Sequence, residues 1–378
     1  MSAPPSLEDT GALSALHGTR PVARLVRLTR LLLGLVLFVG ALQLLKTAAA
    51  GLDILHSSVL VENAGTALGL GWIGALLVLS GSPVAATALA LAAAGEEAAA
   101  GAADRFSELQ GFTMLTGSRL GAAFVVLVTA VVWALREGRG GRMVPLSTAV
   151  IALVGTAVVY VPAALLGGIL LTSTPFQHLD AQLPAQAIDV IDVVYGDLVE
   201  QAETRPAWLV FLAGMAVLLV AFKVIDGALP QLDERSLGAR RLAWLQRKWP
   251  MFGLGALVAL VTMSVSVALT VLVPIVSRGH VRRENILPYV FGANIATLGD
   301  TMVAAFALGS PAAVRIVLAE VIATTIVSVI LLACFYAQVR RGVWAFQLWV
   351  LDTPLRLLAF TAGLFLVPAL VIVAFAVA

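Results

Sequence analysis

The stretch Leu76–Ala86 (LLVLSGSPVAA) interrupts a long apolar run, Gly65–Gly95, near its centre. Proline has no backbone N–H to donate, and glycine loses more conformational freedom in a helix than any other residue. The interruption at Gly81–Pro83 therefore predicts two short helices joined by a turn rather than one continuous helix. The rest of the chain decides whether this pair crosses a membrane or returns to the side from which it entered.

The composition excludes a soluble protein. The chain has 378 residues, of which 60% are hydrophobic and only 12% are charged, whereas a soluble domain carries about 25% charged residues. The net charge of +2 is small and the basic residues are scattered, so we expect no nucleic-acid partner. The single cysteine, Cys334, allows no intrachain disulfide. No metal-binding cluster or catalytic motif is present in the sequence, so we expect neither an enzyme nor a bound cofactor.

Seven other apolar runs are long enough to cross a bilayer, which takes about 20 residues. They are Leu31–Leu52, Phe112–Leu135, Pro145–Leu171, Trp208–Leu229, Ile286–Leu308, Pro311–Ala337 and Leu355–Ala378. A further apolar run, Met251–Val276, lies between two basic loops. An alternative interpretation takes Leu31–Leu52 as a signal peptide cleaved near Ala48–Ala50. The length of the run and the membrane domain that follows it favour a retained first helix.

Loop charges predict the orientation of the chain, because lysine and arginine collect on the cytoplasmic side of a membrane. Basic residues cluster before residue 31, at 136–142, 235–248 and 278–283, and at Arg340–Arg341. The acidic segments Glu96–Gln110 and Thr172–Ala207 are predicted to lie outside, the second with an interfacial helix over Ala187–Glu200. Alanine-rich, lysine-poor composition suggests a bacterial genome. We therefore predict a multi-pass protein of the bacterial cytoplasmic membrane, with its N-terminus inside.

The orientation makes the interrupted run informative. Leu31–Leu52 crosses outwards and Phe112–Leu135 crosses back, so Gly65–Gly95 must begin and end outside. The same reasoning places both ends of Met251–Val276 inside. We therefore predict an all-α polytopic membrane protein with about seven spanning helices and two re-entrant helical hairpins, entered from opposite faces.

Three pairs of segments suggest an internal repeat. Leu33–Gln43 resembles Ala213–Lys223, Ser80–Pro83 aligns with Ser264–Val267, and Leu115–Leu120 resembles Val290–Ile295, at offsets of 180, 184 and 175 residues. Because the two copies start on opposite sides, they predict an inverted-topology repeat, a common plan among secondary transporters. The predicted organisation is a cytoplasmic segment (1–30), the first repeat (31–142), a linking helix with the acidic outside loop (143–207), the second repeat (208–337) and a C-terminal helix region (338–378).

The segment Phe291–Thr297 (FGANIAT), with Asn285–Tyr289 before it and Pro311–Ile316 after it, resembles the sodium/phosphate cotransporter family (the type II proteins and their bacterial relatives). That family carries Gly-Ala-Asn-Ile-Gly-Thr after a hairpin containing Gln-Ser-Ser-Ser. The resemblance covers roughly residues 31–135 and 208–332, and it implies phosphate transport coupled to sodium, with both bound around the hairpins. Here the hairpins read SGSP (80–83) and SVSV (264–267), and Gly117-Ser118-Arg119 replaces Gly-Ala-Asn in the first copy.

Arg119 is the most informative charge, because an arginine within a membrane usually faces a cavity or a partner. One interpretation is an anion-binding guanidinium, and the other is a structural partner of Asp300 or Glu320, or a side chain that reaches the interface. The ion-coupling candidates are Asp300 and Thr301. The predicted substrate-binding residues are Ser80, Ser82, Ser118, Arg119, Ser264, Ser266, Asn294 and Thr297.

We expect a secondary active transporter of a small anion that works by alternating access, with its site near the bilayer midplane between the two hairpins. The resemblance alone implies sodium as coupling ion and phosphate as substrate. The expected partners are the anion and the lipid bilayer, and assembly into a homo-oligomer is left open. Two alternatives remain: a facilitator or exporter of another solute on the same fold, or a membrane scaffold or sensor that transports nothing.

Overall fold

The computed structural model describes residues 9–50, 61–97, 106–136, 142–179, 185–228, 247–279 and 281–377. The described residues form helices and turns, with no strand among them. Seven helical segments within this part of the chain are long and apolar enough to cross a membrane: Leu25–Ala50, Glu108–Arg136, Met143–Thr172, Ala207–Ile225, Arg283–Ala307, Pro311–Ala333 and Pro354–Val377. Each coincides with one of the seven predicted runs, which confirms a polytopic helical membrane protein.

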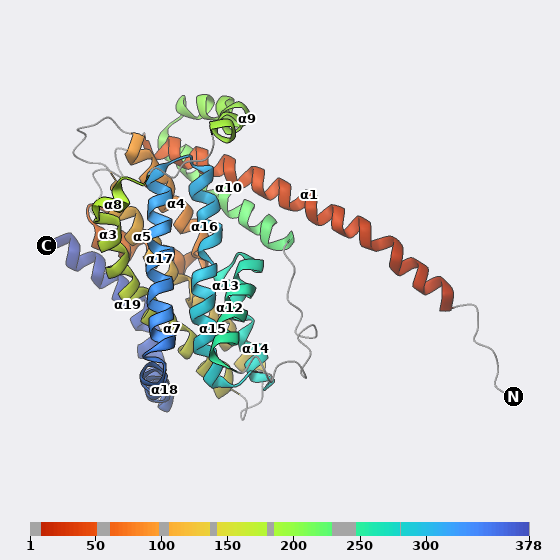
Figure 1. The fold of residues 1–378 in the computed structure, drawn as a ribbon, viewed down its shortest axis with the longest axis vertical. Helices are drawn as coiled ribbons and strands as arrows, with labels where there is room; N and C mark the ends of the chain where they lie inside the picture. Colours follow the sequence, from red (N-terminus) through yellow and green to blue (C-terminus); the bar gives the residue numbers. More distant parts are fainter. Residues whose placement is uncertain are drawn as a thin grey trace.

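The helices of the first half include α3 and α4, which the interrupted apolar run forms (Figure 1). In chain order they are α1 (Asp9–Ala50), α3 (Ala64–Val78), α4 (Ser82–Glu97), α5 (Glu108–Ala122), α6 (Phe124–Arg136), α7 (Met143–Thr172), α8 (Thr174–Gln177) and α9 (Ala185–Glu203). Helix α9 confirms the predicted helix in the acidic segment. Arg139 and Asp104, used above to assign loops, lie outside the described residues.

The helices of the second half complete the bundle. They are α10 (Ala207–Ala228), α12 (Lys248–Thr262), α13 (Val265–Thr270), α14 (Leu272–Ser277), a 3₁₀ turn (Arg283–Asn285), α15 (Ile286–Ala296), α16 (Leu298–Ala307), α17 (Pro311–Ala333), α18 (Tyr336–Asp352) and α19 (Pro354–Val377). Two runs expected to be continuous are broken, at Ala123 and at Thr297. The predicted hairpin Met251–Val276 turns at Met263–Ser264 and is broken again at Val271. Basic residues Arg235, Arg240 and Arg241 lie outside the described residues.

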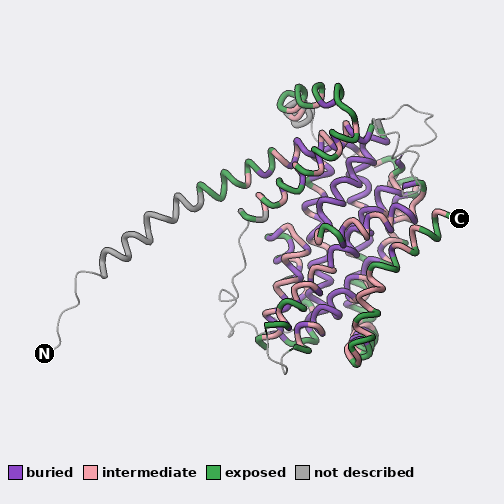
Figure 2. The backbone as a smooth tube through the Cα atoms, turned by 180° about the vertical axis from the view of Figure 1, so that it is seen from behind, coloured by how far each residue is buried: buried purple, intermediate pink, exposed green. Residues whose placement is uncertain are grey.

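Helices α1 and α10 run antiparallel along each other and extend away from the bundle (Figure 1). Gly34 of α1 lies against Ile225 of α10, and Gly214 of α10 lies against Leu45 of α1. The two helices therefore run in opposite directions. The rings of Phe38 and Phe222 meet edge to face, 5.3 Å between centroids. Figure 2 shows buried residues along the inner part of α1 and exposed residues further out.

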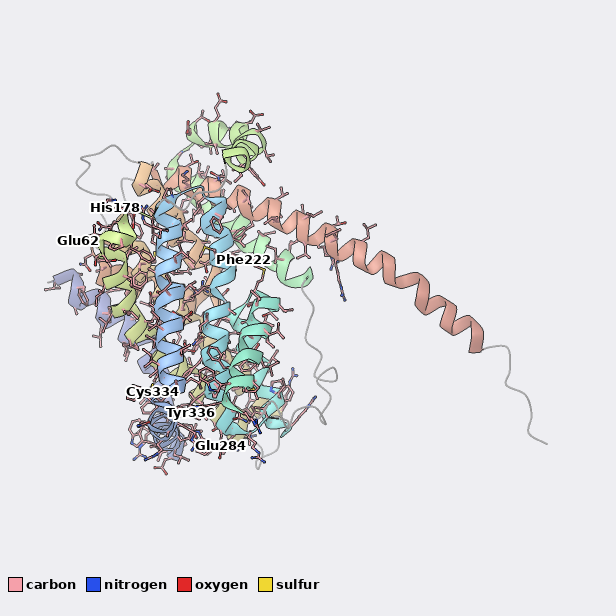
Figure 3. The ribbon with its side chains drawn as sticks, viewed as in Figure 1. Glu62, His178, Phe222, Glu284, Cys334 and Tyr336 are labelled. Atoms are coloured by element: carbon pink, nitrogen blue, oxygen red, sulfur yellow. The ribbon has the colours of Figure 1, made fainter. Side chains whose placement is uncertain are left out.

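The first helical hairpin consists of α3 and α4, joined at Leu79–Gly81. Near its start, the carbonyl oxygen of Val61 accepts a hydrogen bond from Gln110 of α5 (2.6 Å). Near its end, Glu96 accepts one from Ser310, which precedes α17 (2.6 Å). Both ends of the hairpin therefore lie at the same end of the bundle, which we call the upper end and which Figure 3 marks by Glu62 and His178.

The second helical hairpin consists of α12, α13 and α14, with its turn at Met263–Ser264. At its start, Lys248 donates to the carbonyl oxygen of Leu332, at the end of α17 (3.0 Å). At its end, the guanidinium of Arg278 lies 5.8 Å from the ring centroid of Trp133 in α6. The second hairpin thus begins and ends at the lower end, which Figure 3 marks by Glu284, Cys334 and Tyr336.

Each hairpin packs closely against the helix that follows it. Glycines at the contact have no side chain, so the two backbones can touch. A Cβ on Gly71 of α3 would overlap the carbonyl oxygen of Met114 in α5, and a Cβ on Gly117 would overlap that of Leu68. The same two contacts recur in α12 and α15. A Cβ on Gly255 would overlap the carbonyl oxygen of Tyr289, and one on Gly292 that of Phe252. Gly71 and Gly255 are 184 residues apart, and Gly117 and Gly292 are 175 residues apart. These are two of the offsets found between the repeats in the sequence.

Candidate functional site

The turns of the two hairpins meet inside the bundle. The hydroxyl of Ser266, in the first turn of α13, donates to the carbonyl oxygen of Leu79, where α3 ends (3.2 Å). Leu79 and Met263 are the two non-glycine residues with positive φ among the described residues, 57° and 46°, and each terminates the first helix of its hairpin. Both turns therefore use the left-handed backbone conformation at the point where the hairpins touch.

Arg119 lies beside these turns and is completely buried. Its helix, α5, is drawn inwards by the glycine contacts with α3. Its Nη2 donates to the hydroxyl of Thr301 (2.5 Å) and lies 3.6 Å from Oδ1 of Asp300. Its Nε and Nη1 have no hydrogen-bond partner among the described residues. The guanidinium is thus bound through Nη2, and the N–H groups of Nε and Nη1 on either side of it are free.

Asp300 occupies the first turn of α16, which begins just after the break at Thr297. Oδ2 accepts a hydrogen bond from the hydroxyl of Ser82, in the first turn of α4. Oδ1 accepts from the backbone N–H (2.6 Å) and the hydroxyl (3.0 Å) of Thr301. Three donors and the neighbouring guanidinium all stabilise the charged form of a carboxylate. Asp300 therefore accepts three hydrogen bonds and has a guanidinium beside it.

Asn294 and Thr297 surround the break between α15 and α16, and both are completely buried. Tyr160 of α7 donates to the carbonyl oxygen of Asn294 (2.8 Å), and the hydroxyl of Thr297 donates to the same oxygen (3.2 Å). The Asn294 amide nitrogen lies 3.5 Å from the hydroxyl of Thr156. Its side-chain oxygen, Oδ1, has no partner among the described residues, so this broken helix presents a free acceptor.

Glu320 of α17 completes the cluster, although the sequence suggested it only as a structural partner of Arg119. It is completely buried. Its Oε2 accepts from the hydroxyl of Thr116 (2.9 Å), and its carboxylate interacts electrostatically with Arg119. Oε1 has no partner in the described part of the chain. Its position in the middle of the apolar run Pro311–Ala337 is the sequence signal that could have identified Glu320 as part of the site. Tyr160 was missed, because a tyrosine in such a run is not distinctive.

No family model, curated protein or solved structure matches this chain. The site must therefore be interpreted from its own residues.

The structure separates the sequence candidates into two groups. Ser82, Arg119, Asn294, Thr297, Asp300 and Thr301 gather in one buried cluster. The remaining serines use their hydroxyls differently or lie apart. Ser118 donates to Leu115 within α5 (2.7 Å), Ser264 caps α13 through the N–H of Val267 (3.3 Å), and Ser80 is half-buried in the turn.

The cluster carries one positive and two negative side chains, so its net charge is −1 when Arg119, Asp300 and Glu320 are all ionised. Burying a polar group without a partner costs free energy, as does burying uncompensated charge. The arrangement offers free N–H donors on Arg119 to an anion and a free carboxylate oxygen on Glu320 to a cation or a proton. Among the described residues, no three His, Cys, Asp or Glu side chains lie close enough to hold a metal ion.

Asp300 also lines a small apolar cavity of about 190 Å³ between the bundle and the α1–α10 pair. The other lining residues include Phe38, Phe222 and Met263. Asp300 is 7% exposed, whereas Arg119 and Glu320 are fully enclosed. Of the three charged side chains in the cluster, Asp300 is thus the one that borders this cavity.

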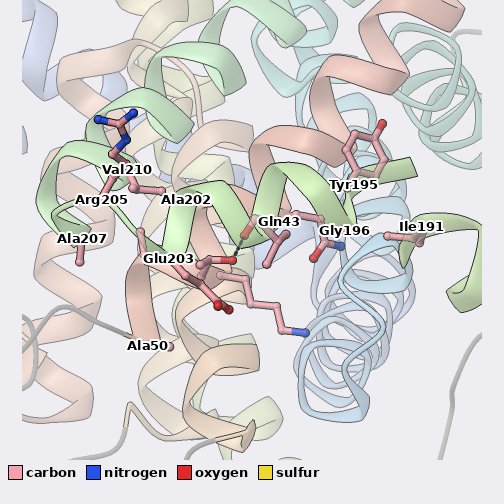
Figure 4. A pocket seen from close by; sticks show the side chains of 14 residues that line it. Gln43, Ala50, Ile191, Tyr195, Gly196, Ala202, Glu203, Arg205, Ala207 and Val210 are labelled. Carbon is pink, nitrogen blue, oxygen red and sulfur yellow. Dashed lines mark hydrogen bonds between the residues drawn. The ribbon is translucent and has the colours of Figure 1, made fainter. Parts of the chain in front are cut away.

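A larger cavity of about 690 Å³ lies at the upper end, between α1, α9 and α10 (Figure 4). Its lining mixes apolar and polar side chains, and the polar ones include Gln43, Lys46, Glu203 and Arg205. Gln43 donates to the carbonyl oxygen of Ala307 (3.1 Å), in the last turn of α16. This cavity therefore touches the far end of the helix that begins beside Asp300.

Proposed function

We propose that this membrane protein is a secondary active transporter of a small anion that works by alternating access. The observation that carries this proposal is Arg119, a wholly buried guanidinium with free donors at Nε and Nη1. Phosphate and carboxylate groups accept charge-assisted hydrogen bonds from guanidinium N–H groups of this kind. Ionisable residues inside a membrane most often mark a substrate or ion pathway.

The proposed architecture is a pair of inverted repeats with a re-entrant hairpin in each. Its support is the recurrence of the glycine contacts at matching offsets and the placement of the hairpins at opposite ends of the bundle. In such transporters the site lies between broken helices near the midplane. The cluster around Arg119 has this setting, because α4 and α16 both begin there.

We propose that the lower end faces the bacterial cytoplasm, with the N-terminus on that side. The lower end carries Lys248, Arg278 and Arg340, whereas Glu96 and Glu108 lie at the upper end. This distribution follows the excess of basic residues on the cytoplasmic side of membrane proteins.

The resemblance to sodium/phosphate cotransporters makes inorganic phosphate the first substrate to test and sodium the first coupling ion. In support, Asn294 and Thr297 of the resembling motif are buried at the helix break, and Ser82 and Ser266 lie where the hairpins meet. The net charge of −1 favours a cation or proton that enters with the anion. Asp300, Thr301 and Glu320 are the proposed coupling residues.

A second candidate function is a non-transporting membrane scaffold or sensor. The contact between Arg119 and Asp300 (3.6 Å) favours it, because a buried ion pair also serves to fix helices in place. This candidate gives no role to the free donors of Arg119 or to the free oxygen of Glu320.

The deciding experiment is uptake of radiolabelled phosphate into liposomes containing the purified protein, under imposed sodium or proton gradients. We expect accumulation above the external concentration, and an initial rate at least about tenfold lower for Arg119→Lys, because an ammonium cannot reproduce the guanidinium fork. Arg356→Lys is the matched control, since Arg356 lies on the surface, paired with Asp352 and over the ring of Trp349. The proposal fails if neither phosphate nor a series of small carboxylates accumulates under either gradient.

A further inference from the structure

Helix α17 places three polar side chains one turn apart on its buried face. Glu320, Thr324 and Ser328 are each completely enclosed. Ile322 and Ile326, on the other face of the same helix, are exposed. Residues four apart lie one above the other on a helix, so these three side chains form a column inside the bundle.

Each member of the column has an oxygen without a hydrogen-bond partner in the described part of the chain: Oε1 of Glu320, Oγ1 of Thr324 and Oγ of Ser328. Serine and threonine hydroxyls in membrane helices commonly donate to the carbonyl one turn back. Thr87, Thr148 and Thr361 of this protein do so. Buried polar atoms with free hydrogen-bonding capacity are the positions at which water binds in protein interiors.

The spacing of the column suits water better than a metal ion. Side chains four residues apart are about 5–6 Å apart at their Cβ atoms, and the eight residues from Glu320 to Ser328 rise about 12 Å. A hard cation needs all its oxygen ligands at about 2.3–2.6 Å, which three oxygens spread over this length cannot provide. One water molecule joining two hydroxyls spans about twice 2.8 Å, which matches one helical turn.

The column leads from the central cluster towards the lower end. Helix α17 starts at the upper end, where Ser310 donates to Glu96, and finishes at the lower end, where Leu332 accepts from Lys248. Glu320 is therefore the inner member of the column, and Ser328 is the member nearest to the lower end.

Glu320 has a carboxylate oxygen that is free to bind a proton, because it has fewer hydrogen-bond donors around it than Asp300. Asp300 accepts three hydrogen bonds and faces Arg119, whereas Glu320 accepts one hydrogen bond, from Thr116. The charged and titratable groups that face Glu320 are Arg119 from α5 and Tyr160 from α7. Of the other helices packed against α17, α16 directs Asp300 at Arg119 and α4 holds Glu96 at the upper end. The hydroxyl of Tyr289 on α15 donates to Ala268, and Tyr336 and Arg340 of α18 lie at the lower end.

We propose that Glu320 binds the coupling proton and exchanges it with the lower end through the Thr324–Ser328 column. The proton moves from hydronium to Oε1 of Glu320, and the same O–H bond breaks on release, so no other reactant is needed. Protonation removes the net charge of −1, and an anion beside Arg119 favours the neutral carboxylic acid in return. The role as coupling ion rests on the proposed function, whereas the proton site itself does not.

The test is infrared difference spectroscopy of the full-length protein in liposomes, titrated from alkaline to acidic pH. We expect a carbonyl stretching band of a protonated carboxylic acid that is present in the wild type and absent in Glu320→Gln. After rapid transfer into D2O, the exchange of this band should slow by about tenfold in Thr324→Val and in Ser328→Ala. Thr325→Val, at the neighbouring and partly exposed position, is the matched control and should exchange at the wild-type rate.

Two results would overturn the inference: persistence of the wild-type band in Glu320→Gln at the same frequency and intensity, or exchange that is as fast in both column variants as in the wild type. Thr324→Val and Ser328→Ala retain the glutamate, so the test does not depend on folding of Glu320→Gln. Failure of phosphate uptake with the infrared result intact would reject the proposed function alone. Uptake with no Glu320 band would reject the proton site alone.

Discussion

Arg119 and Asp300 face each other inside the bundle, with Nη2 of the arginine 3.6 Å from Oδ1 of the aspartate. The two side chains come from α5 and α16, far apart in the chain, and both are buried. Each therefore offsets a charge that would otherwise be enclosed in an apolar bundle without a counterion.

Replacing Arg119 with methionine should lower the free energy of unfolding by about 3 kcal/mol, because Asp300 then remains as a buried unpaired charge. Adding Asp300→Asn should restore part of this loss. Denaturant unfolding of the purified protein in detergent measures both effects. Strictly additive losses in the double variant would show that the two side chains do not stabilise each other.

Gly255→Ala should destabilise the protein by about 3 kcal/mol or prevent folding, because the new methyl group would overlap the backbone of α15 at Tyr289. Gly253→Ala, two residues earlier in α12, is the matched control, since no heavy atom lies within 4 Å of its Cβ position. Thermal unfolding and yield of monodisperse protein measure the difference. Equal behaviour of the two variants would contradict the close contact of α12 and α15.

Leu79→Gly should stabilise the protein by about 1 kcal/mol, because Leu79 adopts a positive φ of 57°, which is unfavourable for a residue with a Cβ. Leu77→Gly should instead cost about 1 kcal/mol, because Leu77 lies inside α3, where glycine is a poor helix former. Thermal unfolding of the two variants should therefore shift in opposite directions. A loss of stability in both would argue against the left-handed turn.

Arg315→Gln should lower the free energy of unfolding by about 2 kcal/mol, because Arg315 joins three helices at the upper end. Its guanidinium donates to Glu108, the first residue of α5. It also donates to Glu96, near the end of α4 (3.4 Å). Arg356→Gln should change stability by less than about 0.5 kcal/mol, since its pair with Asp352 is exposed. Unfolding measured at low and high salt compares the two pairs, and a larger loss for Arg356→Gln would contradict the structure.

The sequence predicted the spanning helices well, because the length of an apolar run and the sign of its flanking charges are set by the bilayer itself. It did not predict the breaks at Ala123 and Thr297. Neither position carries the proline or adjacent glycine that usually announces a break. These interruptions depend on tertiary contacts, such as the hydroxyl of Tyr160 that binds the carbonyl of Asn294.

The candidate site was partly predictable for a similar reason. Arg119 and Asp300 stand out in apolar runs because an enclosed charge is costly, and their proximity agrees with the ion-pair interpretation weighed from the sequence. Thr324 and Thr325 are indistinguishable in the sequence, and only the helix face separates the enclosed hydroxyl from the partly exposed one. Ser118 likewise looked like a ligand, but its hydroxyl donates within its own helix.

The contact between the hairpin turns has a mechanical consequence. A single neutral hydrogen bond, from Ser266 to Leu79, joins them, and such a bond contributes only about 1 kcal/mol. By contrast, α3 with α5, and α12 with α15, are interlocked backbone against backbone through glycines. Each hairpin is therefore packed tightly against its following helix, whereas the two hairpin turns are joined by a weaker contact. Breaking that hydrogen bond would leave the glycine contacts between each hairpin and its following helix intact.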